Sequence, residues 1–401
     1  MTHTPQFGGA LRTNWHLQNG IYFLNNGSFG ATPISVLQKQ SEWRERFEQQ
    51  PVFFTMRTLP VELRNAASIM GEFMGAQGED IVFVDNASTG VNTVLRSLIP
   101  MLNEGDELIT TSHVYNAVRQ TMLYVCSLTG ARYIEVDVPF PLASPEEVVE
   151  RVRAAITPRT RFAMFDHITS PTGLVFPVAD LIALCKEHGI LTMIDGAHAP
   201  GMIDLHLDSL GADWYTGNFH KWLFAPKGSA FLWTAKQHQP TTHSSIISHG
   251  YSMGYHAEFD FNGTKDWSPF LCAPDGLAFM QQLGIENVRR YNRTLALEAR
   301  SMMISAVPQP LPAPESMLES LAAIVLPCAI RTHENPMADA MAIHDMLWDG
   351  ERIEVPVFPF ATGGSVKLLL RIAAQVFNEA AEYKHLCDVL PGILELYNSN
   401  A

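Results

Sequence analysis

The chain alternates short apolar runs with longer segments in which apolar residues recur every three or four positions. A short apolar run bounded by turn residues indicates a buried strand, and the longer spacing indicates an amphipathic helix. The predicted strands cover 80–84, 107–111, 133–136, 161–166, 189–194 and 228–233, and the predicted helices cover 33–46, 61–77, 145–156 and 178–188, with another from residue 116. Strands that alternate with helices imply parallel crossovers. The pattern therefore predicts an α/β fold with a mostly parallel sheet and helices on both faces.

The pattern changes after Pro269. Residues 271–305 have the spacing of long helices, and further strands are predicted at 322–327, 353–358 and 366–372, with helices at 335–348 and 377–390. Several strands with helices to one side suggest a smaller α+β unit. A chain of 401 residues also exceeds what one hydrophobic core usually organises. We expect an extended N-terminal arm (1–20), a large α/β domain (21–270) and a small C-terminal α+β domain (271–401).

The composition is that of a globular chain with an acidic surface. Apolar residues make up 47% and charged residues 17%, and 27 basic against 41 acidic residues give a formal net charge of −14. Such a surface disfavours nucleic acid and anionic membranes as partners. No apolar run approaches the length of a membrane span, and residues 1–20 lack the features of a signal peptide.

Neither the cysteines nor a histidine-rich loop has the pattern of a metal site. The five cysteines are Cys126, Cys185, Cys272, Cys328 and Cys387. They form no CxxC pair, which favours reduced thiols and a cytoplasmic location. His238, His243 and His249 have neither regular spacing nor neighbouring carboxylates, so we expect no metal.

The candidate chemistry centres on one lysine and one aspartate. Lys221 follows a histidine at the end of the apolar and aromatic run 214–222, where burial favours its neutral, nucleophilic form. Asp195 closes the apolar strand 189–194, and open α/β sheets hold their ligands at the carboxyl ends of strands. A reactive amine and a buried carboxylate are the protein groups that pyridoxal 5′-phosphate (PLP) requires.

Other segments contain candidate site residues, and each of these residues has both a functional and a purely structural interpretation. Ser88 and Thr89 open a helix directly after a strand, which suits either a phosphate or an ordinary helix cap. Ser170, within the polar segment 167–173, belongs either to a site wall or to a plain turn. Arg371 follows three leucines, so it would bind either a substrate carboxylate or an interdomain carboxylate.

Four motifs in sequence order carry a family resemblance. They are Asp195-Gly196-Ala197-His198, Gly217-Asn218-Phe219-His220-Lys221-Trp222, Gly263-Thr264-Lys265-Asp266 and Arg371-Ile372-Ala373-Ala374-Gln375-Val376-Phe377-Asn378. With them the chain resembles the class V aminotransferase family of fold type I PLP enzymes, and within it the isopenicillin N epimerases. The resemblance covers nearly the whole chain.

The resemblance implies roles for particular residues. Lys221 would form the Schiff base with PLP, Asp195 would pair with the pyridine nitrogen and His198 would contact the phenolic oxygen. The other implied cofactor-binding residues are Ser88, Thr89, Asn218 and His220 at the phosphate, Tyr115 on the ring, and Ser170. Thr264 would reach the phosphate from the partner subunit of a homodimer. Arg371 would bind the substrate α-carboxylate, with Asn26 and Gly27 beside the substrate.

One departure from the family argues against cysteine desulfurase chemistry. That reaction needs a nucleophilic cysteine on a loop shortly before the carboxylate-binding arginine, and the segment 357–365 has none. Cys328, the nearest preceding cysteine, follows a core-like strand and reads as structural.

The predicted function is PLP chemistry at Cα of an amino acid or an amino-acid-containing small molecule, with epimerisation as the first expectation. Epimerisation needs a second acid on the opposite face, and His113, Tyr115 or a water could supply it. The alternatives are β-elimination, as in the related hercynylcysteine sulfoxide C–S lyases, and transamination. A Schiff-base aldolase without a cofactor and a non-catalytic regulatory protein with the PLP fold are further alternatives, which the combination of Lys221, Asp195 and Arg371 disfavours.

Overall fold

The large sheet is the feature that positions the candidate site. The computed structural model describes residues 6–399, so residues 1–5 of the predicted N-terminal arm lie outside the described residues. Seven strands lie in the order β2-β8-β7-β6-β5-β3-β4. They are β2 Ile81–Val84, β3 Glu107–Thr111, β4 Arg132–Val136, β5 Thr160–Asp166, β6 Leu191–Asp195, β7 Trp214–Asn218 and β8 Ala230–Thr234. Strands β3 to β7 run parallel, and β8 is antiparallel to both β7 and β2, which confirms the predicted sheet.

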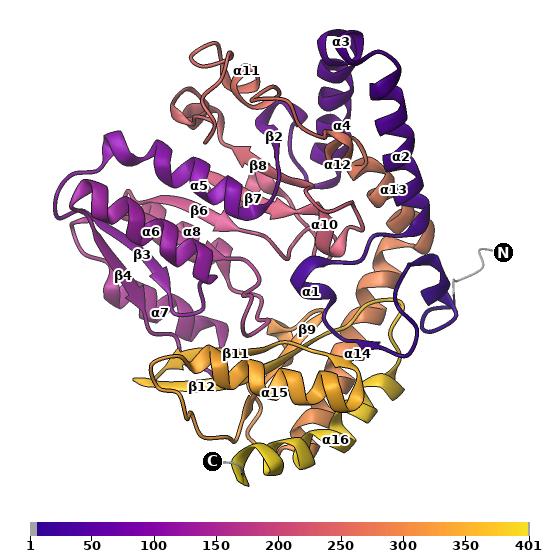
Figure 1. Ribbon diagram of the computed structural model, residues 1–401. Helices are drawn as coiled ribbons and strands as arrows, with labels where there is room; N and C mark the ends of the chain where they lie inside the picture. Colours follow the sequence, from indigo (N-terminus) through magenta and orange to yellow (C-terminus); the bar gives the residue numbers. More distant parts are fainter. Residues whose placement is uncertain (1–5, 400–401) are drawn as a thin grey trace.

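Helices cover both faces of this sheet, because successive side chains of a strand point to opposite sides (Figure 1). Val82 and Val84 of β2 belong to the core that includes α5 (Ala87–Ser97) and α6 (Asn116–Thr129). Ile81 and Phe83 belong to the opposite core, shared with other helices. These are α4 Leu59–Phe73, α7 Pro145–Ala155, α8 Val178–Glu187 and α13 Ala273–Leu283.

A smaller antiparallel sheet follows in the C-terminal part of the chain. Its order is β11-β12-β9, with β9 Leu321–Leu326, β11 Val357–Thr362 and β12 Ser365–Ala373. Helices α14 Ile285–Ala306, α15 Pro336–Glu351 and α16 Ala380–Ser399 accompany it, below the large sheet in Figure 1. Strand β1 (Tyr22–Phe23) pairs in parallel with β10 (Ile353–Glu354). The domain boundary near residue 270 stays a prediction.

Two segments differ from the sequence-based expectation. The strand predicted at 353–358 is divided into β10 and β11 at Pro356, which has no N–H to donate to a ladder. The arm predicted to be extended contains a 3-10 helix, Leu11–Asn14, and is anchored by Trp15. The Trp15 side chain is buried, and its indole N–H donates a 3.2 Å hydrogen bond to the carbonyl of Ala31.

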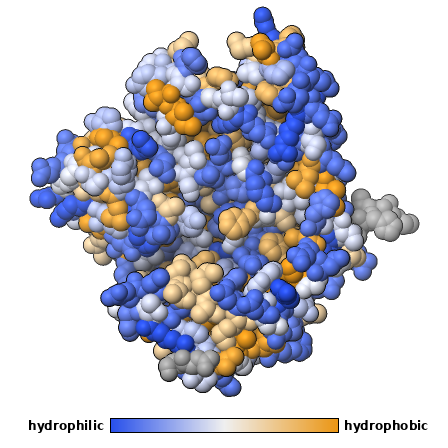
Figure 2. Space-filling model, in the orientation of Figure 1, coloured by the Kyte–Doolittle hydropathy of each residue, from blue (hydrophilic) through white to orange (hydrophobic). Residues whose placement is uncertain are grey.

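The remaining regular structure is one long helix, α2 Ile34–Gln49, and a set of short ones. The short helices are α1 Asn26–Phe29, α3 Pro51–Phe53, a π-helix at Phe54–Thr58, α9 Leu207–Leu210, α10 Phe219–Trp222, α11 Tyr255–Phe259 and α12 Ser268–Leu271, with 3-10 turns at Gly78–Asp80, Ile99–Met101, Lys236–Thr241 and Glu315–Met317. None of the described helices has the length and apolar character needed to cross a membrane. The face on view is mainly hydrophilic, with apolar side chains in separate patches (Figure 2).

Helix α1 packs against α10, which carries Lys221, and a glycine allows this close approach. Gly30 ends α1 with φ +71°, a backbone conformation that L side chains rarely adopt. A Cβ at this position would lie 2.0 Å from the carbonyl oxygen of His220. The contact between α1 and α10 therefore requires glycine at position 30.

Replacement of Gly30 by alanine should destabilise the fold more than the same change at Gly20. Gly20 has a similar φ of +73°, but a Cβ at position 20 would have no neighbour within 4 Å, so G20A carries only the backbone penalty of about 1–2 kcal/mol. G30A adds the clash with the α10 backbone and should cost at least about twice as much. Parallel thermal unfolding measurements would check this, and equal losses for the two variants would contradict it.

Candidate active site

A cavity of about 450 Å³ lies where β5, β6 and β7 end and α5 begins. Eight of the predicted site residues line it: Ser88, Tyr115, Ser170, Asp195, His198, Asn218, His220 and Lys221. They come from separate segments of the chain, which the parallel strands bring to one edge of the sheet. The fold therefore assembles most of the predicted site in one place.

Lys221 is held on α10 immediately after β7. Its Nζ lies 3.2 Å from Nε2 of His198. Burial, and then the positive charge of Arg371, lower the pKa of Lys221 to about 8. An appreciable fraction of this amine is therefore neutral and nucleophilic near physiological pH.

The tautomer of His198 follows from its two partners. The indole N–H of Trp222, which can only donate, lies 3.2 Å from Nδ1 of His198. Burial, and then the charges of Lys221 and Arg371, hold the pKa of His198 well below its usual value, so the ring is neutral. Nδ1 must then accept, and Nε2 carries the proton that it donates to the neutral amine of Lys221.

Two carboxyl groups share the floor of the cavity. Asp195 ends β6, is buried, and accepts a 2.8 Å hydrogen bond at Oδ1 from the N–H of Ala197. Asp166 ends β5, pairs in register with Asp195 and is buried too. The sequence analysis did not select Asp166 as a site residue. Its position at the end of a predicted strand, like that of Asp195, could have identified it.

The start of α5 forms the wall predicted for a phosphate. Asn218 Oδ1 accepts a 2.9 Å hydrogen bond from the N–H of Ala87. Thr89 serves as a capping contact, because both its N–H and its hydroxyl donate to Asn86 Oδ1, at 2.9 and 3.2 Å. Lys227, which sequence reasoning missed, also lines the cavity and adds a positive charge.

His220 is oriented by the strand that follows it. Its Nδ1 lies 2.8 Å from the carbonyl oxygen of Ser229, which can only accept, so Nδ1 carries a proton. Burial, and then the charge of Lys221, lower the pKa of His220 to about 4. The ring is therefore neutral, and its orientation is fixed by Ser229.

Arg371 reaches the site from β12 of the small sheet. Its guanidinium donates to the carbonyl and hydroxyl oxygens of Ser170, the latter at 3.3 Å, and to the hydroxyl of Ser28 at 3.4 Å. It is buried, yet within residues 6–399 it forms no ion pair with a carboxylate, and its Nε has no hydrogen-bond partner. Burial lowers the pKa of Arg371 to about 10. The interdomain ion pair considered from the sequence is thus not formed by the described residues.

Asn26 and Gly27 both open α1, but only Gly27 is placed next to Arg371. A Cβ at Gly27 would lie 3.4 Å from Nη2 of Arg371, so glycine leaves room there. The amide of Asn26 is occupied by the backbone, since it donates to the carbonyl of Lys221 at 3.3 Å and accepts from the N–H of Ala31 at 3.0 Å. The side chain of Asn26 therefore joins α1 to α10.

The two side chains considered as a second acid are placed differently. His113 is fully buried, with Nδ1 2.7 Å from the Thr172 hydroxyl and Nε2 3.1 Å from the Val138 carbonyl. Both of its nitrogens are occupied within the core. Tyr115 lines the cavity and is 47% exposed, so its phenol is accessible to a bound molecule.

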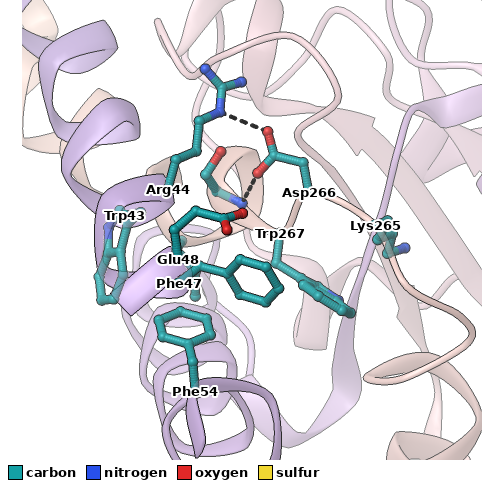
Figure 3. A pocket seen from close by; sticks show the side chains of 10 residues that line it. Trp43, Arg44, Phe47, Glu48, Phe54, Lys265, Asp266 and Trp267 are labelled. Atoms are coloured by element: carbon teal, nitrogen blue, oxygen red, sulfur yellow. Dashed lines mark hydrogen bonds and ion pairs between the residues drawn. The ribbon is translucent and has the colours of Figure 1, made fainter. Parts of the chain in front are cut away.

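Thr264 lies outside this cavity, on an exposed loop. Directly after Thr264 the loop is held by two ion pairs, because Lys265 lies 3.6 Å from Asp85 and Asp266 pairs with Arg44 at 2.8 Å. A second cavity of about 330 Å³ adjoins this loop and has aromatic walls from α2 and the π-helix (Figure 3). It contains none of the predicted site residues.

The Trp222 indole should control the pKa of Lys221 through His198. W222F removes the donor to Nδ1, so the proton is no longer fixed on Nε2 and the neutral amine loses its hydrogen bond. The pKa of Lys221 should then rise from about 8 toward its ordinary value. The pH dependence of amine labelling, read by mass spectrometry at the peptide that contains Lys221, measures this shift.

W233F is the matched control, because the indole of Trp233 donates instead to Asp208, at 3.3 Å. It should leave the labelling midpoint of Lys221 unchanged. A midpoint that stays near 8 in W222F would show that the indole does not set the tautomer.

Comparison with known proteins places this geometry in a family. The family model for Aminotransferase class-V matches residues 21–327. The isopenicillin N epimerase of Amycolatopsis lactamdurans is 32% identical over 392 residues, which cover 93% of this chain and 95% of that protein. The probable chloroplastic L-cysteine desulfhydrase of Arabidopsis thaliana is 30% identical over 394 residues, covering 92% and 82%.

Solved structures agree on the fold. The apo structure of a cysteine desulfurase from Thermococcus onnurineus NA1 superposes with a TM-score of 0.80 at 16% identity, covering 98% of this chain and 99% of that one. The predicted family, fold class, cofactor and enzymatic nature are confirmed. With a family model that spans most of its length and relatives similar over more than 90% of it, the chain belongs to the class-V aminotransferase family of PLP-dependent enzymes.

Proposed function

We propose that this enzyme removes the Cα proton of an α-amino acid, with Lys221 as the base and Arg371 as the binder of the substrate carboxylate. The observation that carries the proposal is the state of Arg371. Its guanidinium is buried and has no carboxylate partner among the described residues, and its positive charge is close enough to lower the pKa of Lys221. An anionic group bound at Arg371 would place the adjoining Cα near the amine. A buried cation of this kind is well suited to a planar carboxylate.

The hydrogen-bonding and charged side chains that line the cavity fit the chemical groups of PLP. Lys221 would carry PLP on Nζ, Asp195 would hold the ring nitrogen, and His198 would donate from Nε2 to the phenolic oxygen. The remaining proposed contacts are Ser88, Thr89, Asn218 and His220 with the phosphate, Tyr115 against the ring, and Ser170 beside it. When bound, PLP supplies an electron sink for the charge left at Cα. The chain's own residues then hold the substrate and move the proton.

Epimerisation is the first proposed outcome, with Tyr115 as the second acid. Lys221 would take the proton on one face of Cα, and the phenol of Tyr115 would return one on the other face. Tyr115 lines the cavity and is accessible, whereas both ring nitrogens of His113 are already bonded. The epimerase relative at 32% identity supports this outcome.

Elimination of a sulfur group from Cβ is the second candidate. This reaction needs only the base at Cα, and the Lys221–His198 pair at 3.2 Å supplies one without a second acid. The desulfhydrase relative at 30% identity supports it. None of the described cysteines lines the cavity, so the persulfide route of a cysteine desulfurase is not proposed.

Incubation with a panel of L-amino acids in deuterated water separates these outcomes. We expect deuterium at Cα together with the D-enantiomer for epimerisation, and pyruvate with sulfide for elimination. Y115F should lower formation of the D-enantiomer by about a hundredfold and preserve most of the Cα exchange, because only the second proton transfer loses its acid. Chiral chromatography and mass spectrometry measure both.

Y124F is the matched control, since Tyr124 lies on α6 close to Tyr115 in sequence and has a similar exposure of 48%. It should behave like the unaltered enzyme. Full epimerisation by Y115F would remove Tyr115 as the acid, and Cα exchange by K221A would end the proposal as a whole.

We further propose a homodimer in which Thr264 serves the partner's phosphate site. The support is that Thr264 is exposed, lies outside its own cavity and sits on a loop fixed by Lys265 and Asp266. The scattered free cysteines support the proposed cytoplasmic location.

Hybrids of T264A and K221A subunits test the shared site. In such a hybrid the T264A chain receives an intact Thr264 from the K221A chain, so its PLP affinity should return to the unaltered value. The T264A homodimer should bind PLP more weakly. Equal affinities in the hybrid and in the T264A homodimer, or a monomer in sedimentation, would contradict the proposal.

A further inference from the structure

A second carboxyl group lies next to Asp195 and has no role in the function proposed above. Asp166 and Asp195 end β5 and β6 and are register partners on these parallel strands. Side chains at such positions point to the same face of a sheet. Both residues line the cavity, and their exposed fractions are only 3% and 4%. Two buried carboxyl groups therefore share one floor.

No cationic side chain of the described residues pairs with Asp166. Within residues 6–399 it forms no ion pair, and its buried Oδ2 has no hydrogen-bond partner. The ionisable groups linked electrostatically to the two carboxyls from other elements are Lys221 on α10, Arg119 on α6 and Tyr215 on β7. Arg119 is already paired with Glu135, at 2.7 Å.

Two adjacent buried carboxylates cannot both ionise at ordinary cost. Burial, and then the negative charge of Asp195, raise the pKa of Asp166 well above its usual range. Burial also raises the pKa of Asp195, but the N–H of Ala197 and the charge of Lys221 oppose that rise. The N–H groups of Tyr115 and Asp166 and the charge of Arg119 oppose the rise at Asp166 as well, yet the pKa of Asp166 still lies well above its usual range. Of the two, Asp195 has the nearby positive charge of Lys221, which favours the ionised form there and the proton at Asp166.

We propose that Asp166 is a positioning residue that stays protonated and donates a hydrogen bond to Asp195, so that Asp195 is the single carboxylate presented to the ring nitrogen of PLP. The floor of the site then carries one negative charge, which matches the one positive charge of a protonated pyridine ring. This inference rests on the cofactor, which family membership establishes. It is independent of whether the reaction is epimerisation or elimination.

Two substitutions with the same shape change separate the two carboxyls. D166N keeps a neutral hydrogen-bond donor of equal size at this position. The holoenzyme should therefore retain its visible absorption maximum and the pH midpoint of that band, and its PLP dissociation constant should stay within about twofold of the value for the unaltered enzyme. D195N removes the ionised partner and should shift the maximum and the midpoint and weaken PLP binding. Absorption titrations and equilibrium dialysis against PLP measure these quantities without any substrate.

D166A tests the hydrogen bond itself. It removes the donor to Asp195, and the PLP dissociation constant should rise about tenfold, the value expected for one lost hydrogen bond to a charged group. D166N restores the donor and should reverse this loss, which a purely space-filling role would not predict. If D166A does not fold, the comparison of D166N with D195N decides alone.

Three results would overturn the proposal. A D166N midpoint shifted as far as that of D195N would show that Asp166 carries the charge. A D166A protein that binds PLP as tightly as the unaltered protein would show that Asp195 needs no such donor. A D166N protein that does not fold would show that a neutral group is not tolerated at this position.

Discussion

The hydrogen bond from the indole of Trp222 to His198 is the interaction on which the chemistry of the site depends. It fixes which imidazole nitrogen carries the proton, and that nitrogen faces Lys221 at 3.2 Å. Burial in a dry pocket disfavours the charged form of a lysine amine. Burial, and then the positive charge of Arg371, lower the pKa of Lys221, and His198, oriented by Trp222, adds a hydrogen-bond donor at 3.2 Å. The reactive amine is therefore a property of the pocket rather than of the lysine alone.

Relatives of this chain carry names of different reactions. An epimerase and a desulfhydrase are similarly related to it, at 32% and 30% identity. Both activities share a base at Cα and differ in what happens after the proton has left. In the function proposed above, the shared step would use residues at the carboxyl edge of the large sheet, and the outcome would depend on side chains across the cavity, such as Tyr115. The proposed first step is therefore compatible with either reaction.

The sequence predicts those features that local pattern encodes. It predicts strand β3 at its observed bounds, and it identifies Asp195 and Lys221 because each follows an apolar strand. Partners distant in sequence are not predictable, because no local pattern records them. Arg371 meets Ser170 and Ser28 across 201 and 343 residues of sequence, and the pairing of Asp166 with Asp195 depends on strand register. The tautomer of His198 is equally hidden, since it depends on a contact that only the folded chain makes.

The pairing of β1 with β10 has a consequence for how the enzyme is built during translation. Leu24 lies in the core of the C-terminal sheet, and its backbone bonds to Glu354 at 3.0 Å and to Ala373 at 2.8 Å. The segment around Leu24 therefore cannot form these hydrogen bonds until almost the entire polypeptide has left the ribosome. The strand that carries Arg371 is completed at the same late stage. The nascent chain thus acquires Asp195 and Lys221 first and Arg371 last, so a prematurely terminated chain would lack the arginine proposed to bind the substrate carboxylate.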